Sequence, residues 1–255
     1  MADTMTPEQI EAIWRMALTQ KHPGKFAFLP SSPRCVACEQ PFGGLGGLLL
    51  RLTRYRQSSM NPNMCNYCEE QLPPGGAEVD VAVVFADVRG STGLAERLGP
   101  SGFAALLDRF YRAATEVIVR ENGLINKMVG DEVVALYLPS GGPDYRRAAA
   151  RSAVELVHAM GYGAKGGPWL SLGVGAHCGL AYVGRVGSSE VGDFTALGDT
   201  MNTAARLQSM ANPGEVVFGE ELYQEIRDEY PGLEGRSVEL RGKEEPVSIR
   251  VLQLG

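Results

Sequence analysis

Two aspartates lie where divalent cations and a phosphate group could be bound. Asp87 ends the apolar run VDVAVVFADV, which has the length of a buried strand. A predicted helix starts just behind it with three small residues, Gly90, Ser91 and Thr92. Free backbone N–H groups at such a helix start bind anions. Asp131 follows a glycine in the turn of KMVGDEV, and two carboxylates at adjacent strand ends suit a pair of divalent ions. These segments predict a metal and phosphate site at one edge of a sheet.

Four cysteines form two CxxC pairs, Cys35 with Cys38 and Cys65 with Cys68, separated by 26 residues. In a protein without a secretory leader this spacing favours metal binding over disulfides. Zinc is the first candidate, because four thiolates bind it tetrahedrally and stabilise a segment with little apolar core. An iron–sulfur cluster and a metal-free redox dithiol are the alternatives. The fifth cysteine, Cys178, falls in a predicted strand and is expected to be a buried, small apolar side chain.

The elements that must position these residues can be followed along the chain. Residues 6–21 predict an amphipathic helix, residues 22–72 a small Pro-, Gly- and Cys-rich module, and LPPGG at 72–76 a linker. From residue 79 the pattern predicts, in order, a strand, a helix, two strands around the Gly-Asp turn, a helix in YRRAAARSAVELVHAM, two strands in LSLGVGAHCGLAYVGRVG and a helix in DTMNTAARLQSMA. A βαββαβ order predicts an α+β, ferredoxin-like domain with helices packed on one face of a mostly antiparallel sheet. We expect the module and its linker over residues 1–76 and the larger domain over 77–255.

Composition excludes several classes of protein. With 255 residues and 44% hydrophobic composition, the chain can form a packed core. A net charge of -6 argues against a nucleic-acid binder, because phosphate neutralisation needs a basic face. The N-terminus has no signal-peptide pattern, and the apolar run at 43–50 is far shorter than the roughly 20 residues that span a bilayer. A cytoplasmic protein without a transmembrane segment is predicted. The arginines of RLTRYR at 51–56 indicate a solvated basic turn or a contact surface for the larger domain or an acidic partner.

Three segments stand in the order found in one enzyme family. FADVRGST, KMVGDEVVALY and FTALGDTMNTAARL occur within residues 79–252, and this stretch resembles the class III adenylate and guanylate cyclases. The resemblance implies that Asp87 and Asp131, with the Val88 backbone, bind two Mg²⁺ or Mn²⁺ ions per active site. It also implies that the phosphates are held by the backbone of five consecutive residues, Val88, Arg89, Gly90, Ser91 and Thr92.

The resemblance assigns further residues to the substrate. Asn202 would position the ribose and Arg206 would stabilise charge on the phosphates in the transition state. These two are four residues apart, so they would project from one face of a helix. A basic residue of the tail would bind the triphosphate, for which Lys243 is the first choice and Arg241 the alternative.

Lys127 and Thr195 would select the base. Adenine offers an acceptor at N1 and a donor at N6, which a lysine donor and a threonine hydroxyl complement, whereas guanine reverses both edges. The pair therefore predicts ATP rather than GTP. Thr195 departs from the aspartate that many family members have here. The threonine-bearing subgroup resembles cyclases that respond to bicarbonate, so stimulation by bicarbonate is a further hypothesis.

The reaction implied is attack of the ribose 3′-oxygen on the α-phosphorus with loss of pyrophosphate, which yields 3′,5′-cyclic AMP. In this family the active site spans two subunits, so a head-to-tail homodimer with two shared sites is implied. A guanylate cyclase is one alternative. The other is a catalytically silent cyclase-like module that serves in metal or redox sensing.

Overall fold

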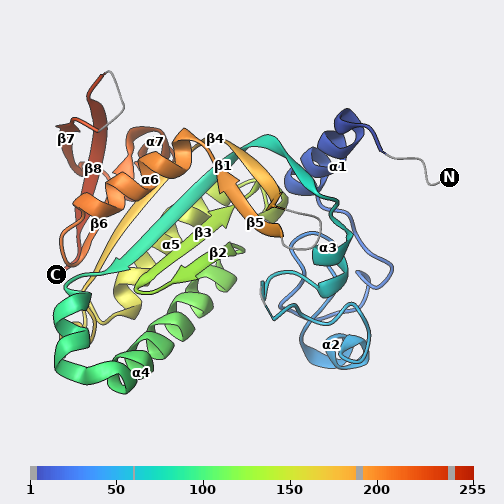
Figure 1. Cartoon of the computed structure of the whole chain (residues 1–255), viewed down its shortest axis with the longest axis horizontal. Coiled ribbons are helices and arrows are strands. Elements are labelled where there is room, and N and C mark those ends of the chain that lie inside the picture. The colour runs from blue at the N-terminus through green and yellow to red at the C-terminus, as the bar shows by residue number, and fades with distance from the viewer. Residues whose placement is uncertain (1–4, 60, 188–191, 241–244) are drawn as a thin grey trace.

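An eight-stranded sheet forms the centre of the larger domain (Figure 1). The computed structural model describes residues 5–59, 61–187, 192–240 and 245–255. The strands are β1 (Gly75–Val88), β2 (Leu124–Val129), β3 (Glu132–Tyr137), β4 (Leu172–Gly187), β5 (Gly192–Leu197), β6 (Glu215–Gly219), β7 (Glu234–Val238) and β8 (Val247–Gln253). They follow the order β2-β3-β1-β4-β6-β8-β7, and β5 pairs with β4. Of the described pairings, β4 with β6 is parallel and the others are antiparallel, which confirms the mostly antiparallel sheet.

Helices cover both faces of this sheet. They are α1 (Pro7–Thr19), α2 (Gly44–Leu50), α3 (Asn66–Gln71), α4 (Ser91–Arg120), α5 (Tyr145–Ala159), α6 (Asp199–Met210) and α7 (Glu220–Ile226), with a 3-10 turn at Pro139–Gly141. Residues of α4, α5 and α7 share one core with Val84, whereas residues of α1 and α6 share another with Val83. The expectation that helices pack on one face is therefore wrong. The reason is that successive side chains of β1 point to opposite faces and both sets are apolar.

The predicted βαββαβ order is confirmed by β1, α4, β2, β3, α5 and β4. One prediction within it is wrong: residues 170–187 contain a single strand, β4, instead of two. The glycines of this segment lie inside the single strand, where α6 packs closely. A Cβ added at Gly175 would lie 2.2 Å from the backbone nitrogen of Gln208. Glycine is therefore required at Gly175 for the approach of a helix, and the strand continues through it.

The N-terminal module packs against the second face of the sheet. Trp14 of α1 stacks on Phe194 of β5 with ring centroids 6.2 Å apart, and its indole N–H donates to the carbonyl of Pro73 at 3.0 Å. Asn63 donates to the carbonyl of Gly123 at 2.7 Å, at the turn between α4 and β2. In Figure 1 the module of α1, α2 and α3 lies at one end of the sheet, and β7 and β8 lie at the other. β1 begins at Gly75, next to the domain boundary predicted at residue 76.

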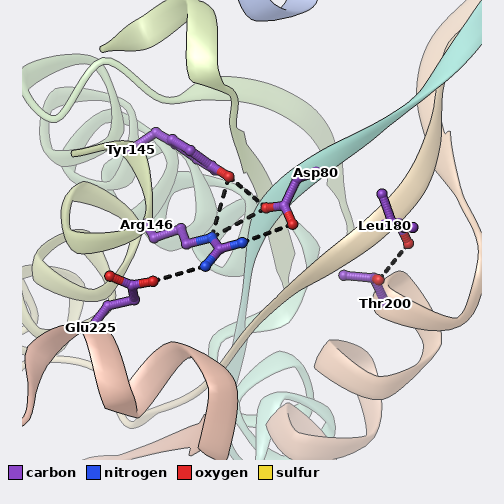
Figure 2. Close-up of polar contacts among 6 residues, drawn as sticks. All are labelled: Asp80, Tyr145, Arg146, Leu180, Thr200 and Glu225. Carbon is purple, nitrogen blue, oxygen red and sulfur yellow. Dashed lines mark hydrogen bonds and ion pairs between the residues drawn. The ribbon is translucent and has the colours of Figure 1, made fainter. Parts of the chain in front are cut away.

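A cluster of charged groups joins three elements on the first face (Figure 2). Arg146 of α5 pairs with Asp80 of β1 at 2.8 Å and with Glu225 of α7 at 2.8 Å. The Tyr145 hydroxyl donates to the same Asp80 at 2.5 Å. Burial and this hydrogen bond raise the pKa of Tyr145 to about 12. Arg146 therefore links β1 to two helices. Within the described residues, no helix combines the length and apolarity that a bilayer crossing requires.

Candidate active site

Three carboxylates gather where β1 ends. Asp87 lies opposite Glu132 of β3 in the strand register, and the Val88 N–H donates to the carbonyl of Asp131 at 3.1 Å. Burial, followed by the charge of Asp131, raises the pKa of Asp87. Burial also raises the pKa of Glu132, followed by the charges of Asp87 and Asp131. Partly buried carboxylates that lie close together repel one another. A hard divalent cation prefers oxygen ligands and would offset this repulsion. The donor set at Asp87 and Asp131 therefore fits Mg²⁺ or Mn²⁺.

Arg89 partly balances this negative charge. Its guanidinium lies 3.4 Å from Asp87 and also donates to the carbonyl of Gln208 at the end of α6. The side chain passes over Gly173, where a Cβ would lie 2.3 Å from the Arg89 Nε. The predicted phosphate-binding role concerned only the backbone of Arg89. Sequence reasoning missed the ion pair, because it depends on the approach of α6 to β4.

The helix start behind Asp87 offers free amides. Gly90 has a φ of 71°, a left-handed conformation that favours glycine, and no side chain caps the N-terminus of α4. The amides of Val88 and Arg89 already donate to the carbonyls of Asp131 and Ser171. Within the predicted phosphate-binding segment, the amides of Gly90, Ser91 and Thr92 at the start of α4 are therefore the ones available to an anion.

The turn that carries Asp131 is held by α4. The Tyr111 hydroxyl donates to the carbonyl of Gly130 at 2.6 Å. Burial, followed by the charge of Asp131, raises the pKa of Tyr111. Gly130 itself has a φ of 60°. Glu132 and Tyr111 were also missed by sequence reasoning. Glu132 could have been found from the hairpin register, which places it opposite Asp87, whereas no local signal identifies Tyr111.

The other predicted site residues lie on β5 and α6. Thr195 is buried on β5, whereas Asn202 is exposed and Arg206 is half-buried on α6. Thr200 fixes the start of α6 by donating to the carbonyl of Leu180 in β4 at 2.6 Å (Figure 2). The residues that α6 buries are Thr200, Met201, Thr203, Ala204, Leu207 and Gln208. Asn202 and Arg206 therefore lie on the helix face that points away from β4, as their spacing predicts.

One chain does not bring Thr195 to Asp87 and Asp131, whereas the C-terminal end of α6, just beyond Arg206, lies beside Arg89. Asp87 pairs with Gly173 of β4, and Thr195 pairs with Gly184 of the same strand. Eleven residues of extended strand span about 35 Å. The structure therefore places Asp87 and Asp131 at one end of β4 and Thr195 at the other.

Lys127 lies on a bulged part of β2. The register shifts between Ile125 and Lys127, and Asn126 donates from this bulge to the carbonyl of Phe194 at 3.0 Å. Lys127 and Phe194 line a cavity of about 410 Å³ that Trp14 of the module also borders. Thr195 does not line this cavity, because neighbouring residues of a strand point to opposite faces. Lys243 and its alternative Arg241 fall outside the described residues.

The four predicted metal ligands of the module converge. The sulfur atoms of Cys35, Cys38, Cys65 and Cys68 all lie within 4.8 Å of one another, and the Sγ atoms of Cys38 and Cys65 are 3.7 Å apart. A tetrahedral ion 2.3 Å from each sulfur requires separations of about 3.8 Å. The cluster therefore fits a single metal ion. Cys178 is buried in the sheet, and burial raises the pKa of its thiol to about 12, as expected for a small apolar side chain.

Comparison with known proteins agrees with this arrangement. The uncharacterized protein Rv1318c of Mycobacterium tuberculosis is 33% identical to this chain over 189 residues. The uncharacterized protein Rv1319c of the same organism is 31% identical to it over 190 residues. These matches cover 71% and 69% of this chain, and 34% of each relative. The chain thus spans about a third of the length of the curated relatives that it matches.

Solved structures of two related enzymes share the fold. The guanylyl cyclase Cya2 superposes with a TM-score of 0.64 at 25% identity and covers 71% of this chain and 95% of its own. The adenylyl cyclase CyaB from P. aeruginosa superposes with a TM-score of 0.60 at 25% identity. The match covers 71% of this chain and 97% of the CyaB chain. The family model of the adenylate and guanylate cyclase catalytic domain matches residues 76–252. With the carboxylates and the sheet in the expected order, the chain belongs to the class III adenylate and guanylate cyclase family.

Proposed function

We propose that the protein is an adenylate cyclase that converts ATP to 3′,5′-cyclic AMP and pyrophosphate as a head-to-tail homodimer with two shared active sites. The observation that carries this proposal is the separation of Asp87 from Thr195 along β4. Each chain holds the metal-binding half of one site and the nucleoside-binding half of the other. Two copies in opposite orientation bring complementary halves together.

Exposed apolar side chains support such a dimer. Val129 is exposed at the end of β2, two residues from Asp131. Leu197 is exposed at the end of β5, and Leu180 is exposed on β4 beside the start of α6. Apolar side chains that no residue of the same chain covers mark contact surfaces. A head-to-tail pairing would cover both groups while it completes both sites.

The residues have separate tasks in the proposed reaction. Asp87 and Asp131 hold two Mg²⁺ or Mn²⁺ ions, which when bound favour ionisation of the ribose 3′-hydroxyl and offset phosphate charge. The amides of Ser91 and Thr92 bind phosphate oxygens. From the partner copy, Asn202 orients the ribose and Arg206 stabilises negative charge on the phosphates. The 3′-oxygen then bonds to the α-phosphorus while the bond from that phosphorus to pyrophosphate breaks.

Base selection rests on Lys127 and Thr195. A lysine donates to adenine N1 and a threonine hydroxyl accepts from N6, while guanine presents a donor and an acceptor in the opposite order. An unpaired buried polar group costs enough to discriminate between the bases. Guanylate cyclase activity is the second candidate, because the fold is shared with a guanylyl cyclase as well as an adenylyl cyclase.

For the module we propose a structural zinc ion held by its four cysteines. The 4.8 Å grouping supports a single ion, because the irons of a cluster hold their cysteines farther apart. The zinc would keep the module folded beside the cavity that Lys127 lines. Its role is then stabilisation of the module that packs beside β2, the strand that carries Lys127, rather than redox sensing.

The direct test is cyclic nucleotide formation by the purified full chain from ATP and GTP, with magnesium or manganese. We expect cyclic AMP, and its loss by at least about 1000-fold in Asp87→Ala. The matched control is Asp108→Ala, which removes an exposed carboxylate on α4 that pairs with Arg112 of the same helix. Cyclic GMP as the sole product would establish the guanylate alternative. The absence of product with either nucleotide would favour the silent module.

A further inference from the structure

The N-terminal module presents a patch of exposed leucines, which we name the leucine tip. Its members lie on α2 and the turn behind it: Leu45, Leu48, Leu49 and Leu52 are 80%, 64%, 69% and 97% exposed. Single exposed leucines are ordinary, but four within eight residues form a contiguous apolar surface. Such a surface in a folded domain marks a site of contact with something outside the chain.

The leucines are exposed because α2 packs through its other face. Gly46, Gly47 and Leu50 are buried. A Cβ at Gly47 would lie 2.0 Å from the carbonyl oxygen of Phe42, and one at Gly46 would lie 2.8 Å from Pro41. The glycines thus let the helix lie tightly on the module, and no rotation of α2 can bury the leucines instead. In Figure 1, α2 lies at the end of the module that is remote from the sheet.

Uncompensated positive charge surrounds the leucine tip. Arg51, Arg54 and Arg56 are exposed, and Arg54 lies over the ring of Tyr67 at 4.3 Å. In the described part of the chain, none of the three forms an ion pair with a carboxylate. The sequence contains no aspartate or glutamate between Glu39 and Glu69. This segment is therefore locally basic, in a chain whose net charge is -6.

We propose that the leucine tip and its arginines dock the protein on the surface of an anionic membrane. Leucine side chains on a protruding helix can enter the boundary between headgroups and acyl chains, while arginines bind lipid phosphates. Positive charge beside the apolar face adds attraction to anionic lipid. The patch therefore has the two components that interfacial binding requires.

Two other occupants fit less well. A symmetric contact between two copies would place the patch against itself, so arginines would face arginines. An acidic protein partner would need a groove shaped to four protruding leucines. A fluid lipid surface accepts exposed leucines without shape matching. The exposed leucines and the neighbouring arginines together thus favour lipid.

Vesicle flotation of the full chain without nucleotide tests this proposal. We expect at least about tenfold more protein bound to vesicles of phosphatidylcholine with about 30% phosphatidylglycerol than to phosphatidylcholine alone, and weaker binding at high salt. Leu48→Ser with Leu49→Ser should abolish flotation, and Arg51→Gln with Arg56→Gln should remove the preference for anionic vesicles. Leu98→Ser is the control, because it changes an exposed leucine on α4.

Each result decides the proposal. Equal binding to both vesicle types, or full binding by the Leu48 and Leu49 variant, would overturn it. So would the absence of flotation combined with self-association that the same variant removes, since this result identifies a second copy as the occupant. The leucine variant should retain its bound metal and its cyclase activity in solution. Flotation needs no turnover, so its failure is distinguishable from failure of the proposed adenylate cyclase activity.

Discussion

In the proposed reaction, Lys127 is the residue on which the choice between ATP and GTP depends most. Its ammonium can donate to adenine N1 but has no acceptor for the N1 proton of guanine. It is exposed at the edge of the cavity that Phe194 lines, so it is available to a nucleotide. A carboxylate at this position would accept from guanine N1 and repel the adenine acceptor. The identity of one side chain thereby favours one base over the other.

We expect Lys127→Glu to lower the kcat/KM for ATP by at least about 100-fold and to raise the ratio of GTP to ATP turnover. The measurement is the rate of cyclic AMP and cyclic GMP formation with each nucleotide. Lys165→Glu makes the same charge change at an exposed loop residue and should leave both rates unchanged. An unchanged nucleotide ratio in the Lys127 variant would contradict its role in base selection.

Residues whose signal is local could be proposed from the sequence. Asp87 and Asp131 each follow a recognisable strand or turn pattern, and the structure places both at one end of β1. Arg89 could not be identified as the counter-ion of Asp87 because the contact requires α6, more than 100 residues away. Tyr111 was missed for a similar reason: its acceptor is a backbone carbonyl in another element. Non-local polar contacts leave no periodic trace in a sequence.

At the scale of elements, Arg146 holds α5 and α7 to the sheet through two carboxylates. In Arg146→Met the half-buried Asp80 would lose its ion pair and keep the hydrogen bond that the Tyr145 hydroxyl donates. We therefore expect the free energy of unfolding to fall by about 1–3 kcal/mol. Denaturant titration measures this loss. Adding Asp80→Asn should recover part of it, because the unpaired charge is then removed.

The neighbouring arginine provides the control for this prediction. Arg147 pairs with Asp228 and Glu229 at the surface and contacts no strand through these ion pairs. Arg147→Met should therefore cost less than Arg146→Met. Equal losses in the two variants would show that the link to β1 contributes nothing beyond a surface ion pair.

The proposed zinc ion would stabilise the module by joining its four cysteines. We expect one zinc ion per chain, and its removal by a chelator should increase amide hydrogen exchange across residues 22–72 while β1 and β4 stay protected. Cys65→Ser should lose the ion, whereas Cys178→Ser, which changes a buried cysteine in the sheet, should retain it. Metal analysis and exchange mass spectrometry measure these outcomes. If the metal analysis finds iron and acid-labile sulfide, the four cysteines hold an iron–sulfur cluster and not zinc.

Element boundaries were predictable where hydrophobic periodicity was regular, and the exceptions have physical causes. Thr6 and Gln9 form a capping box at the start of α1, a local pattern, and the predicted helix is found. Residues 170–187 were predicted as two strands but form one, β4, in which Gly175 accommodates α6. The packing of the module on the sheet was not predicted, because the stacking of Trp14 on Phe194 joins residues 180 positions apart.

At the scale of the whole molecule, the division of the site within one chain determines how activity should respond to mixing. A chain with Asp87→Ala keeps an intact Asn202, and a chain with Asn202→Ala keeps an intact Asp87. In a mixed dimer one site combines both mutations and the other combines both intact halves. Random reassortment makes half of the dimers mixed, so about a quarter of the wild-type rate should return.

The control for mixing uses two variants of the same half. Asp87→Ala with Asp131→Ala should recover nothing, because every site in the mixed dimer lacks a carboxylate. Native mass spectrometry establishes that mixed dimers have formed, and cyclic AMP formation measures recovery. If mixed dimers of Asp87→Ala and Asn202→Ala form and stay inactive, the two halves do not combine across the interface. In that case the separation along β4 would have to be closed by rearrangement within one chain. If about a quarter of the activity returns in the mixture of Asp87→Ala with Asn202→Ala but not in the control mixture, the separation of Asp87 from Thr195 along β4 is the reason that the enzyme needs two copies.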